Sequence, residues 1–252
     1  MVHFVGAGPG AVDLITVRGK ELLEKADVIV YTGSLINPKL LDYTKADAIV
    51  YNSATMTLKE VTDVMITACS EGRTVVRLHT GDQSLYGAVR EQMDILDENG
   101  IAYESCPGVS ACFGAAASLN MEYTLPGVSQ TLIITRMAGK TPVPENETIE
   151  DLAAHKASMA IYLSTGMLGE LSRKLIAGGY DENTPAAIVY KATHPDEVDM
   201  ICTVGELEEA AKSRDITRTA VVLIGDAVTH TGYERSKLYN SSFTTGYRKG
   251  SV

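Results

Sequence analysis

Apolar and polar positions repeat with two different periods in the first half of the chain, and these periods predict strands and helices in turn. Short, nearly continuous apolar runs are typical of strands buried in a parallel sheet, and they lie at residues 2–5, 28–31, 48–51, 74–78 and 101–106. Apolar residues recur at helical spacing between these runs, in residues 16–26, 58–70 and 86–99. The alternation predicts an α/β domain built on a parallel sheet.

The pattern changes around residues 119–130, where Asn120, Pro126 and Gly127 interrupt it. We therefore predict an N-terminal α/β domain over residues 1–122, a C-terminal α/β domain over residues 123–228 and a tail over residues 229–252. The second domain is predicted to be richer in strand than the first. Its strands are expected at residues 131–136, 158–163, 186–190, 200–204 and 220–224, its helices at 167–177 and 205–212, and a loop at 139–150.

The balance of charge limits which partners the protein can bind. Its 252 residues include 22 Lys and Arg against 32 Asp and Glu, so the formal net charge is −10. The tail alone carries +3, which leaves −13 on the rest of the chain. Tight nonspecific binding to nucleic acid is therefore not expected.

No apolar run has the roughly 18 residues of a membrane span, and the first residues lack the basic start and apolar run of a signal peptide. We expect a cytoplasmic protein without a membrane partner. Cysteine and histidine show no zinc-site spacing, so no metal is predicted.

A glycine-rich turn follows the first predicted strand, where open α/β sheets bind ligands. Residues 6–10 read GAGPG, and Gly6, Gly8 and Ala11 fit the dinucleotide-binding fingerprint. Two features argue against a dinucleotide. Pro9 has no N–H for a pyrophosphate, and the second predicted strand ends in Tyr31 rather than near an acidic residue for a ribose. A nicotinamide-dependent oxidoreductase and a tight turn without a ligand both stay open as alternatives.

Two more glycine-bearing segments follow predicted strands, at residues 80–87 (TGDQSLYG) and 107–111 (PGVSA). The carboxyl ends of parallel strands meet at one edge of a sheet, so these segments and residues 6–10 are expected to form one composite pocket. Its walls would be backbone donors and one carboxylate, Asp82. Such a pocket suits a cationic or hydroxyl-rich ligand.

These three segments, with Asp13 and residues 14–16 behind the first, resemble the tetrapyrrole methylases, S-adenosylmethionine-dependent enzymes of corrin and sirohaem synthesis. The resemblance extends to residues 161–163 and 184–186. Within that family, residues 31–38 (YTGSLINP) and 233–239 (YERSKLY) look like the branch that methylates C-11 of precorrin-4 or its cobalt form.

The resemblance implies a fold, a methyl donor and an acceptor. The fold would be two α/β domains, a parallel-sheet N-terminal domain and a mixed-sheet C-terminal domain with the active site between them. The donor would be S-adenosylmethionine, the substrate a tetrapyrrole and the assembly a homodimer. The implied cofactor contacts are Pro9, Thr80, Gly81, Asp82, Leu85, Ser110, Ala111, Tyr162, Leu163, Ala192 and Ala220.

One departure from the family concerns proton transfer. Relatives that methylate uroporphyrinogen place an Asp and a Lys where this chain has Thr32 and, approximately, Ser53. Neither hydroxyl titrates near neutrality. This argues against a uroporphyrinogen methylase and leaves the general base unassigned, with His79, Tyr31 and Glu122 as the candidates.

A tetrapyrrole acceptor carries many carboxylates, which a chain of net charge −10 repels overall, so local cations must bind it. The candidates are Arg77, His79, Arg90, Arg136, Lys191, His194 and the basic tail. Arg136 is the first choice because it lies near the end of a predicted strand. Tyr86 and Tyr123, with Tyr31, are candidates to stack on the macrocycle. A methylase of another tetrapyrrole position and a noncatalytic binding protein stay open as alternatives.

Overall fold

The computed structural model describes residues 1–33 and 35–251. Ser34, within the 31–38 motif, and Val252, the last residue of the tail, lie outside the described residues. The chain divides into two compact units, residues 1–115 with 191–198 and residues 116–190 with 199–252. No local pattern in the sequence predicts that residues 191–198 pack with the first unit.

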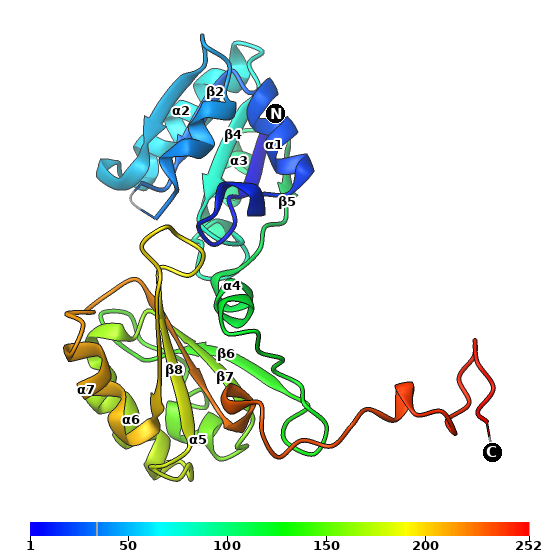
Figure 1. Ribbon diagram of the computed structural model, residues 1–252. Helices are drawn as coiled ribbons and strands as arrows, with labels where there is room; N and C mark the ends of the chain where they lie inside the picture. Colours follow the sequence, from blue (N-terminus) through cyan, green and yellow to red (C-terminus); the bar gives the residue numbers. More distant parts are fainter. Residues whose placement is uncertain (34, 252) are drawn as a thin grey trace. The chain divides into compact units, whose positions relative to one another are not determined.

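The first unit is built on a parallel sheet of five strands in the order β3-β2-β4-β1-β5 (Figure 1). The strands are β1 (Val2–Gly6), β2 (Val28–Tyr31), β3 (Ile49–Asn52), β4 (Val75–His79) and β5 (Tyr103–Cys106). Side chains alternate between the two faces of a strand. Val5 and Ile29 therefore pack under α1 (Val17–Lys25) and the 3-10 helix η2 (Pro38–Tyr43). Phe4 and Val30 pack under α2 (Leu58–Ser70) and α3 (Arg90–Glu98) on the opposite face.

Local capping explains where two helices of this unit begin. The Thr16 side chain accepts a hydrogen bond from the Gly19 N–H at the start of α1, and Thr57 forms a capping box with Glu60 at the start of α2. The prediction of a helix from residue 86 is wrong by four residues. Tyr86 and Ala88 have φ values of 56° and 48°, outside the right-handed helical region, so α3 begins at Arg90.

The second unit has a mixed sheet of five strands in the order β6-β7-β10-β8-β9. Strand β7 pairs parallel with β6, whereas β10 pairs antiparallel with both β7 and β8. Helix α6 packs against both α5 and α7. The bounds are β6 (Leu132–Arg136), β7 (Ser158–Tyr162), β8 (Pro185–Tyr190), β9 (Val198–Thr203), β10 (Ala220–Ile224), α5 (Ile149–Ala153), α6 (Leu168–Ala177) and α7 (Leu207–Lys212). The core contains Met159, Ile161, Leu171, Leu175 and Ile188.

The predicted fold class, a parallel-sheet N-terminal part and a mixed-sheet C-terminal part, is confirmed. Helix α4 (Ala111–Ser118) and helix α5 were not predicted. The remaining short 3-10 turns are η1 (Val12–Leu14), η3 (Ser53–Thr55), η4 (Thr165–Met167), η5 (Val204–Glu206), η6 (Asp226–Thr229) and η7 (Lys237–Tyr239). Within residues 1–33 and 35–251, the longest apolar helices fall short of what a membrane crossing needs.

Candidate functional site

The glycine segments after β1, β4 and β5 meet at the carboxyl edge of the first unit's sheet. They are called here the first loop (residues 6–10), the second loop (residues 80–87) and the third loop (residues 107–111). Gly8 and Gly81 pair through two backbone hydrogen bonds of 3.2 and 2.9 Å. A Cβ on Gly6 would lie 2.6 Å from both the Gly81 oxygen and the Gly108 Cα. The backbones touch so closely that Gly6 and Gly108 leave no room for side chains.

The Asp82 carboxylate links the second loop to the third through hydrogen bonds. One carboxylate oxygen accepts the Gly108 N–H at 2.8 Å, and the other accepts the N–H of Ser84 at 2.9 Å and the Ser84 hydroxyl. Burial alone would raise the pKa of Asp82, but the hydrogen bonds from Ser84 and Gly108 outweigh it and hold the pKa below its usual value. Asp82 is therefore ionised at neutral pH, and its lone pairs leave capacity for a further donor.

Other predicted cofactor contacts of the first unit gather around the same loops. Pro9 and Ser110 are buried, and a Cβ on Gly81 would be 3.6 Å from the backbone of both Ser110 and Ala111. The Leu85 N–H donates to the Asp82 carbonyl at 3.2 Å. The Thr80 hydroxyl lies 3.3 Å from that of Thr32.

Residues 191–198, called here the latch, bind the first loop and the residues that follow it. The Thr193 hydroxyl accepts the Ala11 N–H at 2.9 Å. The His194 ring occupies the space beside Gly10, where a Cβ would lie 2.2 Å from its Cδ2 atom, and bonds to the Pro9 carbonyl. Asn37, before η2, donates to the Gly10 carbonyl at 2.8 Å. The side chains of Thr193, His194 and Asn37, all distant in sequence, thus hold the backbone of residues 9–11.

The latch contains two residues in a strained backbone conformation. Lys191 and Thr193 adopt left-handed φ values of 47° and 66°, on either side of Ala192, a predicted cofactor contact that is buried. Non-glycine residues with such φ values cluster at functional sites. The sequence does not reveal that Asn37 and Thr193 bind the first loop, because their partners lie far away along the chain.

Leu163 carries a similar strain in the second unit. It follows the end of β7 with a φ of 53°, and its side chain is 68% exposed. Tyr162 is the last residue of β7, and Ala220 is the first of β10. An apolar side chain held outward in a strained conformation is consistent with a ligand contact, so Leu163 stays a predicted one.

Arg136, the first choice for the acceptor's carboxylates, is occupied by its own loop. Its guanidinium donates to the carbonyls of Met137 at 3.0 Å, Thr141 at 3.1 Å and Pro142 at 2.7 Å. The geometry gives Arg136 the role of holding the turn after β6. Tyr123 is buried and Glu122 is exposed in the same unit, while Tyr86 of the first unit is 44% exposed.

The remaining basic candidates separate into buried, paired and cavity-lining groups. Arg77 is buried and donates to the Gln92 side chain at 3.0 Å and the Val30 carbonyl at 3.1 Å. Arg90 pairs with Asp94 and Asp97. Lys191 and His194 line a cavity of the first unit.

The surroundings of His79, one of the catalytic candidates, lower its pKa strongly. Burial, followed by the charge of Arg77, lowers its pKa to about 3, so the ring is neutral at physiological pH. Its Nε2 atom has no hydrogen-bond partner among the described residues, and the ring stacks on Phe4. His79 is therefore a weak base in this position. Tyr31, another candidate, packs its side chain against the α1 side of the sheet.

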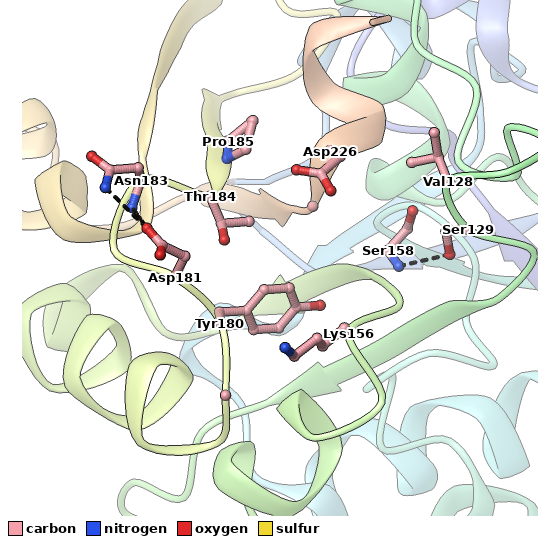
Figure 2. Close-up of a pocket in the computed structure, with 12 residues that line it drawn as sticks. Val128, Ser129, Lys156, Ser158, Tyr180, Asp181, Asn183, Thr184, Pro185 and Asp226 are labelled. Carbon is pink, nitrogen blue, oxygen red and sulfur yellow. Dashed lines mark hydrogen bonds between the residues drawn. The ribbon is translucent and has the colours of Figure 1, made fainter. Parts of the chain in front are cut away.

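Two cavities lie close to these elements. The cavity of the first unit measures about 520 Å³ and adjoins the latch. A cavity of about 350 Å³ in the second unit is lined by Tyr180, Lys156, Asp226 and their neighbours (Figure 2). None of the sequence-predicted site residues lines the second cavity, which lies at the end of the sheet where β7 and β8 begin.

Comparison with known proteins identifies the family. Residues 1–208 match the family model described as Tetrapyrrole (Corrin/Porphyrin) Methylases. The chain belongs to the tetrapyrrole methylase family. The resemblance noted in the sequence is confirmed.

Among curated tetrapyrrole methylases, a cobalt-precorrin-4 C(11)-methyltransferase of Methanocaldococcus jannaschii is 50% identical over 98% of this chain and 96% of its own length. The enzyme of the same name from Priestia megaterium is 44% identical over 99% and 98%. A solved cobalt-precorrin-4 methyltransferase superposes with a TM-score of 0.88 at 43% identity, covering 90% of this chain and 95% of that one. A uroporphyrin-III C-methyltransferase of Thermus thermophilus with S-adenosylhomocysteine has a TM-score of 0.73 at 22% identity, covering 93% and 96%, and shares the fold.

Proposed function

We propose that this protein is an S-adenosylmethionine-dependent C-methyltransferase of cobalamin biosynthesis that methylates C-11 of precorrin-4, or of its cobalt form, to give the corresponding precorrin-5. The observation that carries the proposal is the identity of 50% and 44% to two cobalt-precorrin-4 C(11)-methyltransferases over almost the whole of each chain. The glycine loops of this chain supply the local chemistry that such an activity needs.

The residues at the carboxyl edge of the first sheet fit S-adenosylmethionine. Gly6 and Gly108 allow the three loop backbones to meet there, since a Cβ on Gly108 would lie 2.2 Å from the Gly81 oxygen. Asp82 is ionised and can accept from a ribose hydroxyl or an amino group. The proposed contacts of the first unit are Pro9, Thr80, Gly81, Asp82, Leu85, Ser110, Ala111 and Ala192, and those of the second are Tyr162, Leu163 and Ala220.

S-adenosylmethionine supplies a methyl group activated on a sulfonium. The contribution of this chain is to orient the reactants, which can lower a barrier by about 7–11 kcal/mol relative to free encounter. Charge on sulfur is discharged in the transition state, so strong stabilisation of the cation would slow the reaction. A wall of backbone and small residues meets this requirement, with Asp82 serving the polar parts of the donor.

No side chain of this chain is proposed as a general base. Thr32 bonds to Thr80, and the Ser53 hydroxyl donates to the Tyr31 carbonyl at 3.0 Å. Neither group titrates near neutrality. The neutral His79 is a weak base because of its burial. Proton loss from the methylated ring is accordingly assigned to solvent.

The expectations of a cytoplasmic location and a homodimer stay predictions. They come from the sequence and from the family resemblance. Light scattering of the purified protein at micromolar concentration tests the dimer directly. The mass of a monomer would rule out the predicted homodimer.

A reconstituted pathway tests the activity. The protein is incubated with S-adenosylmethionine labelled in its methyl group and with precorrin-4 or cobalt-precorrin-4 produced by the preceding enzymes. The proposal requires one labelled methyl group in the product, located at C-11 by NMR, only when the protein is present. Label at another ring position, or no label with either acceptor, overturns it.

A further inference from the structure

The cavity of the first unit lies between the residues before η2 and the latch. It is lined by Ala11, Val12, Ile36, Asn37, Pro38, Lys39, Lys191, Thr193, His194 and Pro195. Its ionisable lining residues are basic, with no carboxylate among them. The cavity of the second unit, by contrast, includes Asp181 and Asp226 beside Lys156 (Figure 2). In a chain with net charge −10, a basic lining marks this cavity as suited to an anion.

Lys39 and Lys191 supply the two ammonium groups of this cavity. Lys39 is exposed and forms no ion pair within the described part of the chain. Lys191 pairs with Asp196, whose side chain is 58% exposed. The Lys191 side chain is 32% exposed, so an anion in the cavity can share its ammonium with Asp196. Each ammonium offers three donors to such a group.

The cavity is held in a fixed position against the first loop. Asn37 binds the Gly10 carbonyl from one wall, and Thr193 binds the Ala11 N–H from the other. The His194 ring fills the space beside Gly10, and burial lowers its pKa, so it is a neutral wall rather than a third cation. An anion bound by the two lysines is therefore placed relative to the glycine loops.

We propose that this cavity binds a carboxylate side chain of the tetrapyrrole acceptor through Lys39 and Lys191. The inference rests on the proposed function, which supplies an acceptor rich in acetate and propionate groups. A cavity of about 520 Å³ holds such side chains and one edge of a macrocycle, not the whole ring. Arg136 and Arg77 suit this role less, since backbone carbonyls and Gln92 already accept hydrogen bonds from their guanidinium groups.

Fluorescence titration with uroporphyrin III, a stable porphyrin with acetate and propionate side chains, tests the site. The variants are Lys39→Gln, Lys191→Gln and the double variant. Lys59→Gln and Lys212→Gln are matched controls, because they remove the same charge from exposed lysines that pair with Asp63 and Glu208 and do not belong to the cavity lining. The amide of the same porphyrin, which lacks the carboxylates, reports on stacking alone.

Each cavity variant should weaken uroporphyrin binding about tenfold, and the double variant should weaken it further. The control lysines and the amide porphyrin should show no such change. Uroporphyrin binding by the double variant that equals the parent's, or an equal loss in Lys212→Gln, overturns the inference.

Calorimetry with S-adenosylhomocysteine distinguishes failure of this inference from failure of the proposed function. The double variant should bind it as the parent does. A loss in the double variant assigns the cavity to the donor's own carboxylate and overturns the inference while leaving the proposed function standing. Failure of the parent to bind S-adenosylhomocysteine overturns the proposed function and this inference with it.

Discussion

Replacement of Gly108 by alanine tests whether close approach of the three glycine loops builds the donor site. The new Cβ would lie 2.2 Å from the Gly81 oxygen and 2.7 Å from the Gly6 Cα, and contacts under 3.0 Å essentially do not occur in proteins. All the clashing atoms belong to the backbone, so the loops must separate by close to 1 Å. Overpacking of this kind costs about 1–3 kcal/mol, and separation also weakens the Gly8–Gly81 pairing.

The φ of Gly108 is not in the left-handed region, so the substitution adds a steric effect without a dihedral one. Gly139→Ala is the matched control, because the nearest atom to its Cβ, the Met167 Cε, lies 3.7 Å away. We expect Gly108→Ala to lower the Tm by about 5–10 °C in calorimetry. Its affinity for S-adenosylhomocysteine should fall at least tenfold, whereas the control leaves both unchanged.

Two results would refute this reasoning in different ways. An unchanged Tm in Gly108→Ala means that the loops do not touch as described. A lowered Tm with unchanged S-adenosylhomocysteine affinity, measured below the unfolding transition, means that the loops touch but do not hold the donor.

Three further substitutions test other parts of the site. The folded-state pKa of His79, about 3, lies below its unfolded value near 6.5, so stability is complete above pH 6.5 and falls by about 2 kcal/mol on lowering the pH to 5. Urea unfolding of His79→Phe at both pH values should lack this loss, and an equal loss contradicts the assignment. Leu163→Gly should raise the free energy of unfolding, measured in urea, by about 0.5 kcal/mol, because it relieves the left-handed φ. The same variant should bind S-adenosylhomocysteine more weakly in calorimetry, and an unchanged affinity shows that Leu163 is not part of the site. Arg136→Ala should lower the free energy of unfolding by about 1–2 kcal/mol and should speed proteolysis of the turn after β6. Resistance to proteolysis equal to the parent's argues against a role of Arg136 in holding this turn.

Local sequence pattern was sufficient where an element is defined by its own residues. The helix predicted at 58–70 matches α2 because Thr57 and Glu60 cap it and Val61 and Met65 form its buried face. Helix α4 was missed because its small residues show little amphipathic pattern. The late start of α3 depends on left-handed conformations at Tyr86 and Ala88, which no periodicity reveals.

The candidate site shows the same division. The three glycine loops could be placed together from sequence because each follows a strand of one parallel sheet. The latch could not be placed on the first loop, because the hydrogen bond from Ala11 to Thr193 joins residues 182 positions apart. Lys39, a single lysine after a proline, carries no sequence signal at all. Arg136 was favoured by its position at a strand end, whereas its actual partners are carbonyls of the next turn.

The charges of the proposed reactants explain why the separation of Asp82 from the two cavity lysines matters. S-adenosylmethionine is a cation at sulfur, and the acceptor is a polyanion, so no uniform surface charge favours both. At physiological ionic strength the Debye length is about 8 Å, which screens most of the net charge of −10 from either ligand. Recognition then depends on the nearest groups. Asp82, held ionised by Ser84 and Gly108, serves the donor, and Lys39 and Lys191 serve the acceptor. Because Lys39 is exposed and Lys191 is partly exposed, acceptor affinity should weaken with added salt much more than affinity for the donor.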